Sequence, residues 1–139
     1  MKLKALFGKD KSFEEAFGRW LDSALSVPIP AEVVSFSFNL VELPTFNAAD
    51  PRFGVELIGA TSFSKEDSDW ACDDAFKAAP AVLEIPVSFS GDAWDECLRR
   101  MHTLITRYLT CGSAGADKLN SAVGVGIGFV DGDLHLVRS

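Results

Sequence analysis

Residues 64–76 hold the densest group of side chains that could support recognition or chemistry. Five carboxylates surround one tryptophan, one cysteine and a single lysine. Because like charges at this spacing repel one another, we expect the segment to lie where water or a cationic partner can reach it. A tryptophan between carboxylates can stack on a partner's Arg or Lys while the acids supply complementary charge. This interpretation predicts a protein-binding surface made of Glu66, Asp67, Asp69, Trp70, Asp73 and Asp74. The alternative is that Trp70 turns into the core and the acids only solvate a helix end.

The same segment offers oxygen ligands for a divalent cation. Asp69, Asp73 and Asp74 are close in sequence, but they lack the DxDxDG pattern of a calcium loop and no glycine supplies its turn. The two histidines, His102 and His135, are far apart and lack HxH or HExxH spacing. We therefore expect neither a metal ion nor a cofactor.

Two groups in the second half of the chain resemble parts of catalytic sites. Asp92, Asp95 and Glu96 could supply the carboxylate pair of a glycosidase, but acids in the first turn of a helix are already favoured by its dipole. Cys97 and His102 are five residues apart on one predicted helix, or about 500° around its axis, so they point to different sides. We predict no catalytic residue among them.

The glycines at 124, 126 and 128 superficially resemble a nucleotide-binding loop. Their spacing is GxGxG rather than GxGxxG, and they precede a predicted hairpin rather than a helix. A phosphate would therefore lack a helix N-terminus to bind. Glycines on one face of a strand more simply let a helix pack close to it, or flatten it.

The composition limits the class of protein. The chain has 139 residues, 47% of them apolar, with eleven Phe and three Trp, which indicates a single packed domain covering 1–139. The net charge of −7 disfavours nucleic acid as a partner and favours a basic protein or a cationic ligand, although acidity also serves solubility alone.

The location of the protein follows from its thiols and its apolar runs. The three cysteines, Cys72, Cys97 and Cys111, form no CxxC motif, which favours reduced thiols in a reducing compartment. No run reaches the roughly 18 apolar residues of a membrane span, and the apolar start ends at Phe7, too early for a secretory signal. We expect a cytoplasmic protein that does not bind membranes.

The helices are predicted from apolar spacing and capping residues. A helix over 12–26 begins at a capping box, Ser12 with Glu15, and a second long helix spans 92–111. Trp20 and Trp94 lie in the apolar stripes of these helices, so both are expected to be buried. A short helix over 66–78, with an ordered loop as the alternative, and a helical turn over 114–122 complete the set.

The strands are predicted from alternation of apolar and polar residues. They cover 32–43, 53–58, 81–87, 123–130 and 133–138, and the first two could pair antiparallel. Asp131-Gly132 predicts a two-residue hairpin turn between the last two. Adjacent strands without intervening helices argue for an α+β fold, a single layer of mostly antiparallel sheet with two main helices packed on it.

Three short pieces of the chain, 36–42, 56–59 and 69–73, resemble small uncharacterised bacterial proteins. Some of these are suspected immunity proteins of polymorphic toxin systems. The resemblance covers about residues 36–76. It implies a cytoplasmic protein that covers the active site of a toxin domain, often a nuclease with a basic cleft, and it implies a role only for the acidic Trp70 segment.

Three functions are therefore compatible with the sequence. The first is a non-enzymatic acidic domain that binds a basic protein, such as a toxin domain. The second is a small ligand-binding or enzymatic domain with a pocket beside the sheet, near Trp70 and Asp73. The third is a structural domain or homo-oligomer whose exposed aromatic side chains contact other copies. A flat acidic patch would favour the first, and a deep pocket with convergent polar groups the second.

Overall fold

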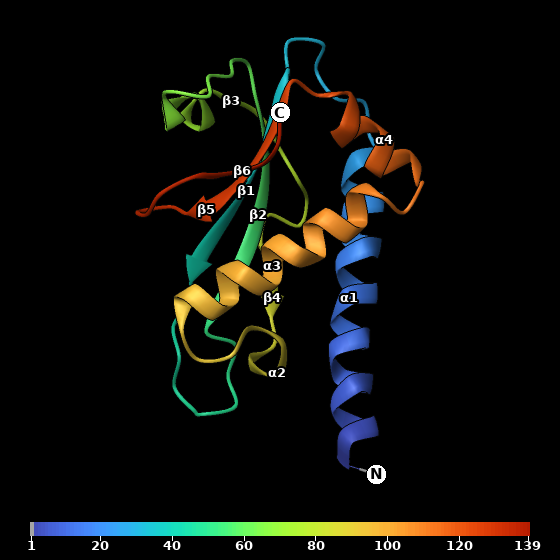
Figure 1. Cartoon of the computed structure of the whole chain (residues 1–139), viewed down its shortest axis with the longest axis vertical. Coiled ribbons are helices and arrows are strands. Elements are labelled where there is room, and N and C mark those ends of the chain that lie inside the picture. Colours follow the sequence, from blue (N-terminus) through green and yellow to red (C-terminus); the bar gives the residue numbers. More distant parts are fainter. Residues whose placement is uncertain (1) are drawn as a thin grey trace.

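The fold is an α+β arrangement in which helices cover one face of a mixed sheet (Figure 1). The structure is a computed structural model that describes residues 2–139, with side chains from Lys11 onward. Its elements in chain order are α1 (Lys2–Ser26), β1 (Ser35–Glu42), β2 (Phe53–Ala60), the 3₁₀ helix η1 (Ser68–Cys72), β3 (Asp74–Lys77), β4 (Leu83–Ile85), α2 (Val87–Ser90), α3 (Trp94–Leu109), α4 (Ala114–Ser121), β5 (Gly124–Phe129) and β6 (His135–Arg138).

The sheet has the strand order β3-β2-β1-β5-β6, and β4 pairs with the other end of β2. Strands β1 and β2 pair antiparallel over their full length, as the sequence predicts. Strand β5 lies parallel to β1, which is the one parallel pair among the described residues. This pair places β5 of the C-terminal hairpin directly beside the central strand β1, with β6 at the edge of the sheet, a contact that the sequence did not predict.

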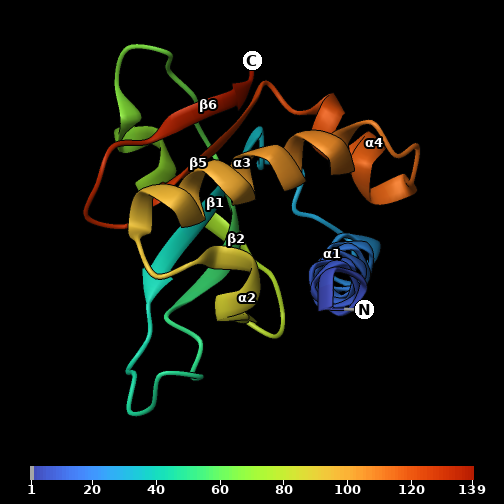
Figure 2. The ribbon, with the colours of Figure 1, turned by 60° about the horizontal axis from the view of Figure 1, so that its bottom comes forward.

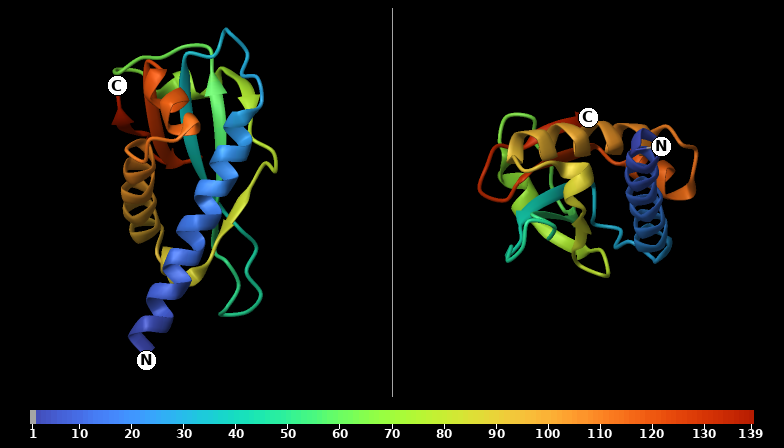
Figure 3. Two further views of the ribbon diagram at one scale, coloured as in Figure 1. Left: turned by 90° about the vertical axis from the view of Figure 1, so that its right-hand side faces the viewer. Right: turned by 90° about the horizontal axis from the view of Figure 1, so that it is seen from below.

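The core lies between the sheet and its two long helices, α1 and α3 (Figure 3). Phe36, Phe38 and Leu40 of β1 alternate with polar residues and are buried. The ring of Phe17 on α1 lies 6.1 Å from that of Phe38 and 6.4 Å from that of Tyr108 on α3. The predicted α+β class and its two main helices are therefore confirmed.

Polar contacts hold the helices in their positions over the core. The Trp20 indole is buried, as predicted, and its N–H donates to the Pro80 carbonyl at 3.0 Å. The Tyr108 hydroxyl donates to Asp22 at 2.6 Å, which ties α3 to α1. Burial, with this hydrogen bond, raises the pKa of Tyr108 well above its usual range.

Several predicted boundaries were wrong. Helix α1 begins at Lys2 rather than at Ser12, which lies exposed within it. No proline precedes Ser12, and Gly8 alone costs only about 1 kcal/mol within a helix. The predicted strand over 81–87 is shorter, because Pro86 ends it and leads into α2.

The predicted helix over 66–78 was also wrong, and the segment divides into two short elements. The Asp67 side chain accepts from the Asp69 N–H and caps η1. Residues after Cys72 then extend and pair with β2 as strand β3. The sheet edge thus captures residues whose own helical pattern is weak.

The predicted C-terminal hairpin is confirmed, but its turn is longer than two residues. Strands β5 and β6 pair antiparallel, with an irregularity between Val125 and Gly126. Residues 130–134 connect them, and the Gly132 N–H donates to the Phe129 carbonyl at 3.0 Å. Asp131 and Gly132 therefore lie within a wider loop, called here the β5–β6 loop (residues 130–134).

Candidate functional site

The acidic segment, residues 64–76, covers part of the sheet face that the helices leave open. Trp70 is only 4% exposed, and its ring centroid lies 5.2 Å from that of Phe63. A Cβ atom added at Gly124 would lie 2.1 Å from the Phe63 ring, and one at Gly126 would lie 3.3 Å from the Trp70 ring. The glycines of β5 therefore make room for these two rings, not for a helix.

This burial places Trp70 in the interior, which is the alternative that the sequence left open. Its indole is not available as an exposed anchor for a partner. The carboxylates on either side of it, Glu66, Asp67, Asp69, Asp73 and Asp74, all remain exposed, as their mutual repulsion requires.

Local hydrogen bonds with serine hydroxyls organise the exposed acids. The Ser62 hydroxyl donates to Asp73 at 2.8 Å, and the Ser64 hydroxyl donates to Glu66 at 3.3 Å. The Ser64 oxygen also accepts from the Asp67 N–H at 3.1 Å. The segment therefore presents its charges from a loop that leads into η1 and β3.

A groove lies beside this loop on the open face of the sheet. We call it the sheet-face groove; its cavity is about 370 Å³ and its polar lining includes Asn39, Glu56, Asp69, Cys72, Asp74 and Lys77. The Asn39 side-chain oxygen accepts from Ser37 at 2.8 Å. Lys77 is the one basic residue in this lining, so the groove is acidic overall.

A second cavity lies on the other side of the β5–β6 loop, and its wall is an exposed tryptophan. Trp94 is 59% exposed, so the prediction that it is buried was wrong. It begins α3, beyond the buried stripe that starts at Cys97. We call this cavity the Trp94 pocket; it has a volume of about 490 Å³ and is lined by Glu42, Trp94, Leu98, Phe129, Asp131, Gly132, Asp133 and His135.

Aromatic packing holds the exposed indole against the end of the sheet. The rings of Trp94 and Phe129 meet edge to face, 6.2 Å apart and at 89°. Phe129 in turn packs edge to face against buried Phe53, at 5.4 Å. The wall of the pocket is thus attached to the core through one aromatic residue.

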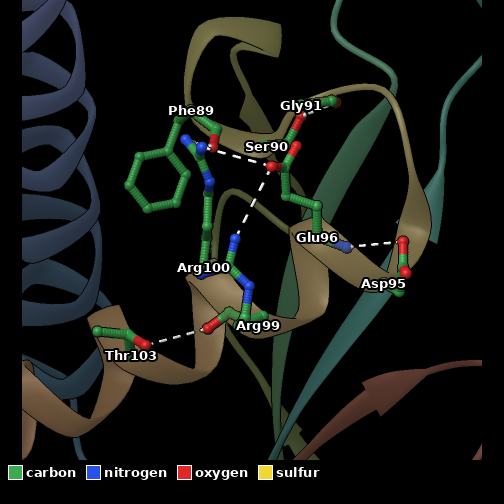
Figure 4. Close-up of polar contacts among 8 residues, drawn as sticks. All are labelled: Phe89, Ser90, Gly91, Asp95, Glu96, Arg99, Arg100 and Thr103. Atoms are coloured by element: carbon green, nitrogen blue, oxygen red, sulfur yellow. Dashed lines mark hydrogen bonds and ion pairs between the residues drawn. The ribbon is translucent and has the colours of Figure 1, made fainter.

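A set of polar contacts fixes the start of α3, the helix whose first residue is Trp94; Figure 4 shows those made by Glu96, Arg99 and Arg100. Arg100 donates to the Phe89 carbonyl at 2.9 Å and pairs with Glu96 at 3.5 Å. Just before the helix, Arg52 pairs with Asp92 at 2.8 Å, which ties the β1–β2 connection to the same point. These contacts join three parts of the chain at the start of α3.

The same contacts give structural roles to the acids that resemble a glycosidase pair. Asp92 pairs with Arg52, Glu96 pairs with Arg99 and Arg100, and Asp95 accepts from the Glu96 N–H at 3.0 Å. Their positive or backbone partners hold the first turn of α3 in place.

The remaining candidate groups differ in their accessibility. Cys97 is buried, and desolvation raises the pKa of its thiol to about 12, so it is a poor nucleophile at neutral pH. Cys72 and Cys111 are exposed free thiols. Within the part of the chain that the structure describes, no group of three or more His, Cys, Asp or Glu residues could hold a metal ion.

The two cavities meet at the β5–β6 loop, and both are lined by carboxylates. The groove and the pocket both contact Phe129 and Gly132. Figures 1 and 2 show η1, the β5–β6 loop and the start of α3 along the same side of the molecule. We call this surface the acidic face; it consists of Trp94 and the carboxylates Glu42, Glu56, Asp69, Asp74, Asp131 and Asp133.

The charges of the acidic face are free to meet a partner. Across residues 11–139, whose side chains the structure describes, none of its six carboxylates forms an ion pair. The sequence pattern predicted Asp69 and Asp74 as binding residues, but it placed Trp94 in the core and did not single out Glu42, Glu56, Asp131 or Asp133. The signal available was the Asp-Gly-Asp loop, which was interpreted only as a turn.

Comparison with known proteins adds no relative. Among residues 2–139, no helix combines the length and apolar character required to cross a bilayer. The chain matches no protein-family model, no curated protein and no solved structure. The geometry and charge of the acidic face are therefore the features that bear on function.

Proposed function

We propose that this protein is a non-enzymatic, acidic protein-binding domain whose acidic face covers a basic surface of a partner. The observation that carries this proposal is the combination of six carboxylates without ion pairs, Lys77 as the one cation lining the two cavities, and an exposed tryptophan. Interfaces commonly combine an aromatic anchor with a complementary electrostatic rim. The other exposed acids of residues 64–76, Glu66, Asp67 and Asp73, are neighbours of Asp69 and Asp74 along the chain and add to the negative charge.

The proposed partner class is a toxin domain with a basic substrate cleft. The resemblance of 36–42, 56–59 and 69–73 to suspected immunity proteins favours this class. An acidic domain lying over a basic cleft would exclude a polyanionic substrate by occupying the same charges. Such a protein would act in the cytoplasm, where the toxin must be neutralised.

Association kinetics test the proposal. A partner is first isolated by affinity capture from the native host, and association is then measured at two salt concentrations. We expect Asp69→Asn, Asp131→Asn and Asp133→Asn together to slow association roughly fivefold at low salt, because long-range attraction steers encounter. The difference should shrink at high salt, because exposed charges are screened over about 8–10 Å at ordinary ionic strength.

A matched control separates local charge from net charge. Glu15→Gln, Glu32→Gln and Glu84→Gln together remove the same number of negative charges from exposed positions outside the acidic face. This control should associate nearly as fast as the parent protein. Equal slowing in both triple variants, or in neither, would remove the acidic face from the interface.

The second candidate function is binding of a small cationic ligand in the sheet-face groove, beside Asp69 and Asp74. Its volume of about 370 Å³ lies within the usual range for small-molecule sites, which favours this alternative. A thermal-shift screen with small amines distinguishes the two functions. A saturable rise in Tm that Asp74→Asn abolishes would favour the ligand-binding function over the protein interface.

A further inference from the structure

The Trp94 pocket has the chemistry of a site for one planar cation. Its wall is an indole that is 59% exposed, although large apolar side chains are usually covered. The perpendicular contact with Phe129 keeps one side of this indole packed and leaves the rest facing solvent and the cavity. Because this packing already holds the indole in place, binding a ligand costs less side-chain conformational entropy.

The charges around the wall select the sign of the ligand. Glu42 comes from the end of β1, whereas Asp131 and Asp133 come from the β5–β6 loop, so carboxylates approach the cavity from two separate elements. The lining contains no lysine or arginine among the described residues. A cation therefore gains both from the ring face of Trp94 and from the carboxylates, while an anion is repelled.

We propose that the Trp94 pocket holds the guanidinium group of one arginine side chain from the protein partner. A guanidinium is planar, so it can stack on an indole and still direct its N–H groups in the ring plane toward carboxylates. An ammonium is a compact, strongly hydrated charge that loses more hydration when it approaches an indole and has no planar face to stack on it, so it should bind more weakly. This inference rests on the proposed function, because it assigns the occupant of one part of the acidic face.

The site can be tested without a partner. The probes are N-acetyl-arginine methylamide, its lysine analogue and its neutral citrulline analogue, which keeps the shape of arginine but removes the charge. Binding is measured from the Trp94 indole N–H resonance by NMR. We expect saturable binding of the arginine probe at millimolar concentration, with lysine several-fold weaker and citrulline at least about tenfold weaker.

Variants show whether the pocket itself is responsible. Asp131→Asn with Asp133→Asn should weaken binding of the arginine probe, and Trp94→Leu should weaken it about three- to thirtyfold, measured by the remaining shifts of backbone N–H groups in the β5–β6 loop. Phe46→Ala removes another exposed aromatic residue, 87% exposed and outside the pocket lining, and should leave binding unchanged. Equal binding of arginine and citrulline, or no saturable shift, would overturn the proposal.

The source of the arginine is tested with the captured partner. Each exposed arginine of the partner is replaced by lysine in turn. At one position, this replacement should weaken binding to the protein with Trp94 but should have little further effect on binding to the Trp94→Leu variant. The absence of such a coupled position would overturn the assignment to a protein arginine. Failure of the proposed function has a different outcome: the probe would still bind in the pocket, but no basic partner would be captured.

Discussion

The two acid-flanked tryptophans of this protein, Trp70 and Trp94, have opposite environments. Trp70 lies within the densest run of carboxylates, yet it is buried against Phe63 over the glycines of β5. Trp94 begins an amphipathic helix, yet it is exposed beside Glu42, Asp131 and Asp133. Neighbours along the chain therefore did not determine which indole meets solvent. The position of each indole on the sheet decides its exposure. The glycines of β5 leave room for the Trp70 ring on the sheet face, whereas Trp94 contacts Phe129, the last residue of β5, where the strand ends.

This contrast separates a structural tryptophan from a recognition tryptophan. Trp70 fastens the acidic segment to the sheet and so orients Asp69 and Asp74 toward the groove. Trp94 provides the contact surface itself. Both contribute to one acidic face, but only loss of Trp70 should damage the fold.

The largest expected effect is that of Trp70→Ala on stability. We expect the free energy of unfolding to fall by about 3–5 kcal/mol, the usual cost of truncating a large buried aromatic residue. Chemical denaturation followed by circular dichroism measures this loss. A change below about 1 kcal/mol would show that the second face of the sheet does not depend on this indole.

A smaller effect is expected from Gly124→Ala. The new methyl group would lie 2.1 Å from the Phe63 ring and would push this ring away from Trp70. We expect a loss of about 1–3 kcal/mol in the same denaturation experiment, as for other overpacked sites. Gly112→Ala is unsuitable as a control because its φ is +80°. Gly18→Ala is suitable because nothing lies within 4 Å of its added methyl group, and it should not destabilise the protein.

The thiols near the two tryptophans should show the reverse order of exposure. Cys72 follows the buried Trp70 by two residues and is exposed. Cys97 follows the exposed Trp94 by about one helical turn and is buried. At neutral pH, iodoacetamide should modify Cys72 within minutes in the native protein and Cys97 only on unfolding, as measured by mass spectrometry. Fast native modification of Cys97 would mean that the buried face of α3 does not pack tightly against the core at this residue.

The raised pKa of Cys97 also predicts a loss of stability at alkaline pH. The unfolded thiol ionises near pH 8.5–9, but the native thiol keeps its proton until about pH 12. Between these values the unfolded state binds fewer protons, so the free energy of unfolding falls as the pH rises, by at most about 1.4 kcal/mol per pH unit for this group. Tyr108, whose pKa is also raised, adds to the fall from about pH 10. Cys97→Ala should make the slope shallower, and an unchanged slope would contradict this explanation.

The smallest effect on stability is expected for Trp94→Ala. Because most of this side chain is exposed and its main aromatic contact is Phe129, we expect a loss below about 1 kcal/mol. Denaturation beside Trp70→Ala gives the comparison directly. A loss as large as that of Trp70→Ala would make Trp94 a structural residue and remove its recognition role.

The sequence predicted the layers of the fold but not the pairing across the sheet. Alternating apolar residues such as Phe36, Phe38 and Leu40 mark their strand because one face must be buried. The parallel pairing of β1 with β5 depends on residues almost ninety positions apart, and no local pattern encodes it. The same limit explains the site. Asp69 and Asp74 stand out locally, whereas Glu42, Trp94 and Asp131 meet only after that pairing places the β5–β6 loop beside α3.

The most direct test of the central claim observes the three tryptophans together while an arginine-rich peptide is added. Each indole N–H gives a separate NMR signal, so one titration reports on Trp20, Trp70 and Trp94 under identical conditions. We expect a saturable shift of the Trp94 signal, reduced by salt, while the signals of buried Trp20 and Trp70 stay nearly constant. A shift confined to Trp70, or no saturable shift at Trp94, would contradict the assignment of recognition to the Trp94 end of the acidic face.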